Sequence, residues 1–163
     1  MVASAKSRCL ILACGNTLRG DDGAGPWLAD WARRRFSDLS GFRVISRPQW
    51  TPELAEDIAG ADAVLFVDCS LEARPGSISL SPVEPISQSS GLATHHLSAP
   101  ELLALARDLY SALPRESLLL TIGAGSVALG EHFSDAVKAA LPKACSRIEE
   151  TVLRLLARKT ASE

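Results

Sequence analysis

Residues 15–25 have the sequence Gly15-Asn16-Thr17-Leu18-Arg19-Gly20-Asp21-Asp22-Gly23-Ala24-Gly25, a glycine-rich loop that carries two adjacent carboxylates. An apolar run, 9–13, precedes this loop, and an amphipathic segment, 26–36, follows it. This order predicts a strand, a glycine loop and a helix. Because open α/β sheets bind ligands at the carboxyl ends of their strands, the loop is a candidate binding site.

The ligand expected at this loop is a cation. Glycine loops commonly bind phosphates through backbone N–H groups at a helix N-terminus. The glycine spacing here matches neither the dinucleotide fingerprint nor the P-loop, whose lysine is absent. Asp21 and Asp22 would also repel a pyrophosphate, by roughly 1 to 4 kcal/mol per charge pair at about 4 Å. The alternative is that one aspartate caps the helix beginning near Pro26, which accounts for only one of the two.

Size and composition indicate a single domain, 1–163. The chain has 163 residues, of which 47% are hydrophobic, enough for one sizeable core. Its formal net charge of -2 gives no basic face for nucleic acid. Its apolar runs fall short of the roughly 18 residues of a membrane span. The four cysteines form no C-x2-C pair, so neither a structural zinc site nor a disulfide framework is implied, and a cytoplasmic protein is expected.

Strand-like and helix-like segments alternate along the chain. This order predicts an α/β three-layer sandwich: a twisted, mostly parallel five-stranded sheet with helices on both faces, one strand, 77–81, being the candidate antiparallel one. Segment 82–94 is expected to be a mobile loop, Thr51 the N-cap of the second helix, and Pro142 a kink or break in the last. The predicted strands are 9–13, 42–46, 63–67, 77–81 and 118–122, and the predicted helices are 26–36, 51–59, 99–113 and 134–158.

Polar residues that could bind a metal lie where predicted strands end or loops begin. Asp22 follows the first strand, Asp68 follows the strand 63–67, and His95 and His96 follow the long loop. Two carboxylates and an imidazole suit a borderline divalent metal such as Ni, Zn, Mn or Co. Three protein ligands leave positions open for water or substrate. The alternatives are that Asp68 caps a turn and that the histidines are ordinary surface residues.

The sequence resembles the hydrogenase maturation proteases, endopeptidases that trim the large subunit of nickel-iron hydrogenases. The resemblance covers nearly the whole chain. It is carried by several motifs in a fixed order: Gly15-Asn16-x-Leu18-x-x-Asp21-Asp22-Gly23-x-Gly25, the apolar strand ending in Asp68, Pro75-Gly76, His95 with Leu97, Thr121-Ile122-Gly123, Leu129 and Phe133-Ser134.

The resemblance implies a nickel-dependent checkpoint. The family's metal-binding positions fall on Asp22, Asp68 and His95, with His96 as a competitor for the last role. Such a protease acts once nickel is in the precursor, and then removes a C-terminal extension. The substrate would supply the nickel. The small size of the chain and the lack of a coiled-coil repeat fit a monomer that docks its partner transiently. Hydrolysis would be of an aspartic or metal-dependent type, with Asp22 and Asp68 at the reaction centre and Asp21 or Asp22 as the base.

Two alternatives to this function remain. A cysteine hydrolase could use Cys69 with His95 or His96, although the adjacent Asp68 would raise the pKa of the Cys69 thiol. Replacing Cys69 with serine would abolish cleavage under the cysteine mechanism and leave it largely intact under the metal-dependent one. A non-catalytic nickel-binding maturation module could use the same ligands without cutting.

Overall fold

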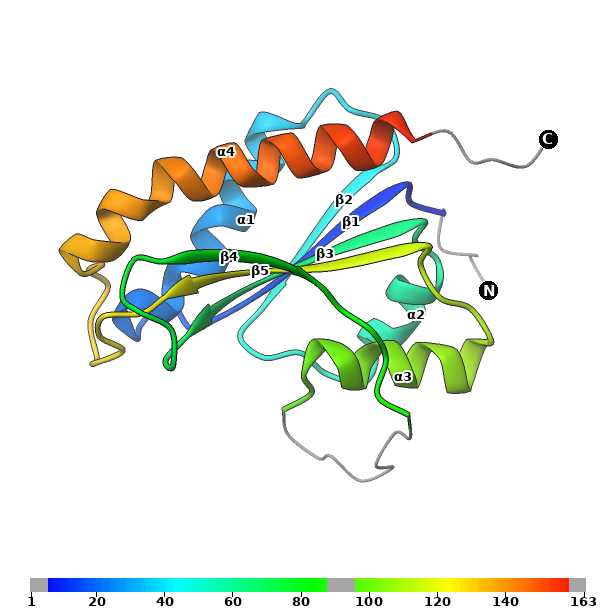
Figure 1. Cartoon of the computed structure of the whole chain (residues 1–163), viewed down its shortest axis with the longest axis horizontal. Coiled ribbons are helices and arrows are strands. Elements are labelled where there is room, and N and C mark those ends of the chain that lie inside the picture. Colours follow the sequence, from blue (N-terminus) through cyan, green and yellow to red (C-terminus); the bar gives the residue numbers. More distant parts are fainter. Residues whose placement is uncertain (1–5, 88–95, 159–163) are drawn as a thin grey trace.

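The structure is a computed structural model that describes residues 6–87 and 96–158. Within these ranges the chain forms a five-stranded sheet of order β2-β1-β3-β5-β4, in which only β4 is antiparallel to its neighbour, β5 (Figure 1). The elements in chain order are β1 (Cys9–Cys14), the 3-10 helix η1 (Gly20–Gly23), α1 (Ala24–Arg35), β2 (Phe42–Arg47), α2 (Leu54–Ala59), β3 (Ala63–Ser70), β4 (Ile78–Pro82), α3 (Ala99–Tyr110), β5 (Glu116–Gly123) and α4 (Asp135–Ala157).

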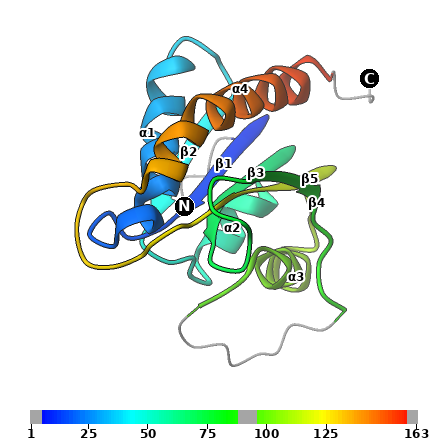
Figure 2. The ribbon, with the colours of Figure 1, turned by 60° about the vertical axis from the view of Figure 1, so that its left-hand side comes forward.

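Helices cover both faces of this sheet. Helices α1 and α4 lie on one face and α2 and α3 on the other, as Figures 1 and 2 show. Successive side chains of a strand point to opposite faces of the sheet, so each apolar strand contributes side chains to the two hydrophobic cores, one on each face. Ile11 and Leu65 pack in the core beneath α1 and α4, whereas Leu12 and Phe66 pack in the core beneath α2 and α3. The predicted three-layer α/β sandwich is therefore confirmed.

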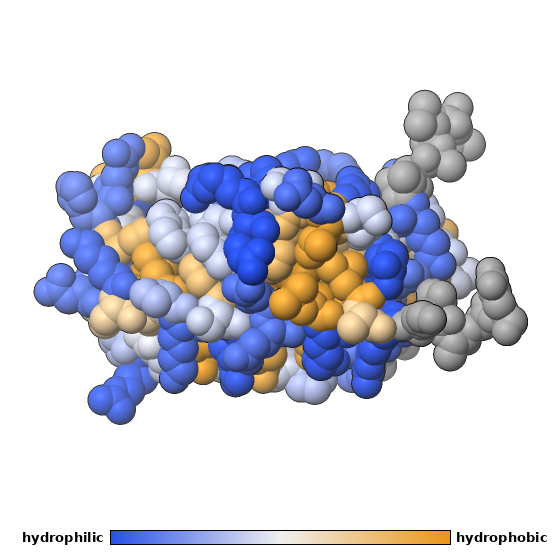
Figure 3. Space-filling view, turned by 90° about the horizontal axis from the view of Figure 1, so that it is seen from above, coloured by the Kyte–Doolittle hydropathy of each residue, from blue (hydrophilic) through white to orange (hydrophobic). Residues whose placement is uncertain are grey.

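The outer surface over α4 is mixed in character. Figure 3 looks onto this side and shows hydrophilic residues surrounding smaller apolar patches. None of the helices among the described residues combines the length and the apolar character needed to span a bilayer.

Three details of the helices differ from the sequence-based predictions. Helix α2 begins at Leu54 with Glu53 as its N-cap, so Thr51 does not cap it; the Thr51 carbonyl instead accepts a turn hydrogen bond from the Leu54 N–H at 3.1 Å. Helix α3 ends at Tyr110 because Ser111 adopts the left-handed conformation. Helix α4 continues through Pro142 to Ala157, so the proline does not break it.

The loop predicted over 82–94 falls largely outside the described residues. Strand β4 extends to Pro82, and the structure describes the chain up to residue 87 and again from residue 96. His95, the predicted third metal ligand, lies outside the described residues.

Candidate functional site

The candidate site lies at the carboxyl edge of the sheet, where β1 and β3 end side by side. These strands pair in parallel, with Ala13 opposite Val67, so the residues that follow them, Cys14 and Asp68, are neighbours. Helix η1, between β1 and α1, brings Asp22 to the same edge. This is the edge at which open α/β sheets bind their ligands.

Two glycines make the close approach of this loop to the strand possible. Gly15 has φ of +150°, and a Cβ added to it would lie 1.9 Å from the Asp22 carbonyl oxygen. A Cβ on Gly25 would lie 2.2 Å from the Cys14 carbonyl oxygen. Any side chain at either position would push η1 and α1 away from β1, so these glycines determine where Asp22 sits.

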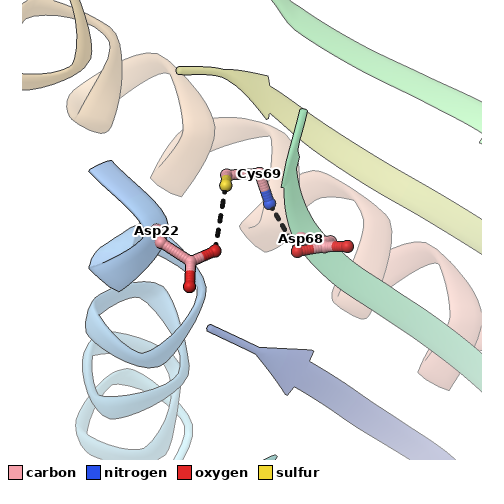
Figure 4. Close-up of side chains that lie close together, drawn as sticks. All are labelled: Asp22, Asp68 and Cys69. Carbon is pink, nitrogen blue, oxygen red and sulfur yellow. Dashed lines mark hydrogen bonds between the residues drawn. The ribbon is translucent and has the colours of Figure 1, made fainter. Parts of the chain in front are cut away.

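The carboxylate of Asp22 is half-buried and held at both oxygens. Its Oδ2 accepts the backbone N–H of Asn16 at 2.7 Å, and its Oδ1 accepts the thiol of Cys69 at 3.2 Å (Figure 4). Helix α1 begins with Gly23 as its N-cap, and no side chain caps it. Asp22 therefore does not cap this helix, contrary to the alternative considered from the sequence.

Asp68 and Cys69 lie near the end of β3, where they pair with Thr121 and Ile122 of β5. The Asp68 Oδ1 accepts the backbone N–H of Cys69 at 2.8 Å, so this carboxylate does not cap a following turn. One carboxylate oxygen each from Asp22 and Asp68, together with the Cys69 Sγ, all lie within 4.8 Å of one another. Such a group is compact enough to surround one metal ion.

Burial and like charges shift the acidity of this cluster. Burial, with the charge of Asp22 adding to it, raises the pKa of the Asp68 carboxyl despite hydrogen bonds from Cys14 and Cys69. Burial and the neighbouring carboxylates raise the pKa of the Cys69 thiol to about 12 and also raise that of the Cys14 thiol. Without a cation, both thiols therefore stay protonated at neutral pH.

Asp21 lies in a different environment from Asp22. Its side chain is fully buried and accepts the backbone N–H groups of Gly125 at 2.7 Å, Ser126 at 2.9 Å and Ser134 at 2.7 Å, and the Ser134 hydroxyl at 2.7 Å. Burial alone would raise the pKa of this carboxyl, but these hydrogen bonds outweigh it and the pKa is lowered. A carboxylate held in this way ties the glycine loop to the start of α4.

The structure thus brings together Asp22 and Asp68 and sets Asp21 apart from them. Of the two histidines considered from the sequence, His96 is exposed and lies just before α3, whose N-cap is Ser98. The thiols of Cys14 and Cys69 join the carboxylates. Their positions in the sequence were visible, since Cys14 precedes the glycine loop and Cys69 follows Asp68, but only the sheet shows that both contact the carboxylates.

Comparison with solved structures gives a consistent set of relatives. The [NiFe] hydrogenase maturation protease HybD from Thermococcus kodakarensis is 28% identical, with 88% of this chain and 98% of that chain covered and a TM-score of 0.65. The hydrogenase 2 maturation peptidase from a Thaumarchaeota archaeon is 29% identical, with 90% of this chain and 98% of that chain covered and a TM-score of 0.61. The hydrogenase maturating endopeptidase HybD from E. coli shares the fold at 20% identity, with 90% of this chain and 93% of that chain covered and a TM-score of 0.70.

No protein-family model matches the sequence, and no curated protein sequence matches it. The solved structures nevertheless match about nine-tenths of the chain and nearly all of their own length. The resemblance to hydrogenase maturation proteases is therefore confirmed.

Proposed function

We propose that this protein is an endopeptidase that removes the C-terminal extension of a nickel-loaded hydrogenase large-subunit precursor. The observation that carries this proposal is the approach of Asp22 and Asp68, from segments 46 residues apart in the sequence, within the group of donor atoms spanning 4.8 Å at the carboxyl edge. These are the two positions to which the family resemblance assigns nickel recognition. The proposed localisation is the cytoplasm, and the proposed state is a monomer.

The site is suited to a metal that arrives with its substrate. Asp22 and Asp68 are both partly exposed, so their oxygens are accessible from the edge of the sheet. Two carboxylates and the predicted His95 suit nickel and leave coordination positions for the precursor's own ligands. Recognition of the bound nickel would hold the adjacent peptide bond against this edge.

Exposed leucines border this edge and support a macromolecular substrate. Leu18 in the glycine loop is 55% exposed, Leu71 directly after β3 is 70% exposed, and Leu129 between β5 and α4 is 87% exposed. The Gly130 N–H donates to the Leu18 carbonyl at 2.9 Å, so two of these segments lie together. Large apolar side chains gathered at one edge are typical of a protein-binding surface.

For the hydrolytic step we propose Asp22 as the base that takes a proton from the attacking water. The nickel, when bound, supplies a Lewis acid that polarises a carbonyl or a water. Asp21 receives no role in proton transfer, because its side chain is fully buried and accepts four hydrogen bonds, whereas the Asp22 carboxylate is partly exposed at the edge of the sheet. Asp21 instead fixes the loop that carries Asp22.

Mass spectrometry of a nickel-loaded large-subunit precursor, incubated with and without the protein, tests this function. We expect the precursor to lose its C-terminal extension with the wild-type protein. Asp22→Ala should prevent this loss, whereas Asp30→Ala, on the exposed surface of α1, should permit it. An unchanged precursor mass with folded wild-type protein would leave the nickel-binding module as the better assignment.

The cysteine hydrolase is the less favoured function. A thiol with a pKa raised to about 12 and a hydrogen bond to a carboxylate is a poor source of thiolate. Under our proposal Cys69→Ser cleaves the precursor more slowly but keeps activity, because Asp22 and Asp68 remain. Complete loss of cleavage in a folded Cys69→Ser variant, together with a covalent adduct on Cys69 in the wild type, would favour the cysteine mechanism.

A further inference from the structure

The thiol of Cys69 belongs to the same cluster of donor atoms as the two carboxylates. Its Sγ lies 3.2 Å from the Asp22 Oδ1, and its backbone N–H donates to the Asp68 Oδ1 at 2.8 Å. Figure 4 shows the Cys69 side chain and the Asp22 carboxylate pointing toward one another. An ion bound by both carboxylates would therefore lie within reach of this sulfur.

The alternation of β3 brings sulfur and carboxylate to the ion from different sides. The side chain of Cys69 points to the same face of the sheet as those of Leu65 and Val67, and it packs against the core beneath α1 and α4. The side chain of Asp68 points to the opposite face, the same face as that of Phe66, which packs beneath α2 and α3. The thiol therefore approaches the strand end from the side of α1, next to Asp22, and would complete the cluster rather than duplicate Asp68.

A sulfur donor changes which metals this cluster prefers. Carboxylate oxygens alone suit Mg, Ca and Mn, whereas thiolate favours softer ions, and a mixed set suits borderline ions such as Ni and Zn. A protease that must distinguish nickel from the abundant hard cations would gain selectivity from one thiolate. Neither Asp22 nor Asp68 provides it.

We propose that Cys69 is a further nickel ligand, whose Sγ binds the ion together with Asp22 and Asp68. The proposal rests on the proposed function, in that the ion concerned is the one carried by the precursor. As the sulfur–metal bond forms, the S–H bond breaks and the proton passes to solvent water. The hydrogen bond to the Asp22 Oδ1 is then lost, which frees that oxygen for the same ion.

Titration of the full-length protein with Ni²⁺ alone, followed by absorption spectroscopy, tests this ligand. We expect a sulfur-to-nickel charge-transfer band in the wild type that is absent in Cys69→Ser and Cys69→Ala. Nickel binding should weaken at least about tenfold in both variants, since the loss even of a residue that only supports a ligand costs about 10–100-fold. Mg²⁺ binding should stay unchanged.

Two matched cysteine variants control the assignment. Cys14→Ser removes the neighbouring thiol, which contacts Asp68 and packs on the side of α2 and α3, and Cys145→Ser removes a thiol of α4. Both should keep the charge-transfer band. No band in the wild type at saturating Ni²⁺, or a band that persists in both Cys69 variants, would overturn the proposal.

Proton release gives a measurement that does not depend on the spectrum. In weak buffer, the wild type should release one more proton per bound nickel than Cys69→Ser, and equal release would contradict thiolate binding. Thermal melting of the nickel-free variants checks that they are folded. If the wild type cleaves the precursor but shows no charge-transfer band, Cys69 is not a nickel ligand and the protease function stands. If the wild type shows the band but does not cleave the precursor, Cys69 is a nickel ligand and the protease function fails.

Discussion

The carboxylate of Asp21 accepts both the backbone N–H and the hydroxyl of Ser134, each at 2.7 Å, across 113 residues of sequence. Ser134 is the N-cap of α4, and its Oγ also accepts the Val137 N–H. One buried side chain therefore fixes the glycine loop, the loop after β5 and the start of the last helix relative to one another. Asp22, the next residue, takes its position from this arrangement.

Replacing Asp21 with alanine should destabilise the fold strongly. The change leaves the N–H groups of Gly125, Ser126 and Ser134 without their acceptor. Because hydrogen bonds to charged groups contribute about 1.5–3 kcal/mol and unsatisfied buried groups cost about 1–3 kcal/mol each, we expect a loss of at least about 3 kcal/mol. Urea denaturation measures it. Asp30→Ala, exposed on α1, should change the free energy of unfolding by less than about 0.5 kcal/mol.

The same carboxylate should contribute to acid unfolding. Hydrogen bonds outweigh burial and lower the pKa of Asp21, and the hydrogen bond from Arg154 lowers that of Glu116. Acids with a lowered pKa contribute stability that is complete above their unfolded pKa, near 4, and is lost as the pH falls through the folded pKa. The free energy of unfolding should therefore drop below about pH 4. An Asp21→Asn variant should show a shallower drop, and parallel pH curves would contradict this role.

Gly25→Ala should be far more damaging than Gly60→Ala. Alanine is the better helix former by about 1 kcal/mol, yet a Cβ at Gly25 would lie 2.2 Å from the Cys14 carbonyl oxygen. The same atom at Gly60 would lie 3.5 Å from its nearest neighbour, an ordinary contact. We expect Gly25→Ala to lose several kcal/mol, on the scale of the largest single-residue effects. Equal thermal melting of the two variants would mean that the loop can move away from β1 at little cost.

Asp68→Asn should separate stability from activity. Burial and the charge of Asp22 raise the pKa of Asp68, and an acid with a raised pKa costs stability once the pH is high enough to ionise it. At neutral pH the variant should melt at or above the wild-type temperature, while precursor cleavage should fall by about 10–100-fold or more. Thermal melting beside the cleavage assay measures both. A variant that melts well below the wild type would indicate that the charged carboxylate is needed for folding.

Leu129→Ser should weaken docking of the precursor without slowing the chemistry. The side chain is 87% exposed at the edge of the candidate site, whereas Leu109, 63% exposed near the end of α3, provides a matched surface leucine away from Asp22 and Asp68. We expect Leu129→Ser to raise the KM for the nickel-loaded precursor about 3- to 10-fold, at unchanged kcat, and Leu109→Ser to change neither. Steady-state cleavage kinetics distinguish the two. A lowered kcat would instead indicate that the loop shapes the site itself.

The layers of the fold and the two acids at the edge of the sheet could be predicted from the order of residues along the chain. Apolar runs such as 9–13 and 63–67 have no polar face, so they require a sheet covered on both sides, and Asp22 and Asp68 follow two of these runs. Family motifs then indicated a metal-dependent protease. Local details that depend on competing hydrogen bonds were less predictable, as the cap at Glu53 and the continuous helix through Pro142 show.

Only the tertiary structure separated the roles of the adjacent acids. Asp21 and Asp22 are equivalent in the sequence, but η1 turns one side chain inward to the N–H groups before α4 and the other toward the end of β3. The partners of Asp21 lie more than 100 residues away, and so do not appear in any local pattern. The meeting of Cys69 with Asp22 likewise depends on the parallel pairing of β1 and β3, because it is the sheet that brings their carboxyl ends together.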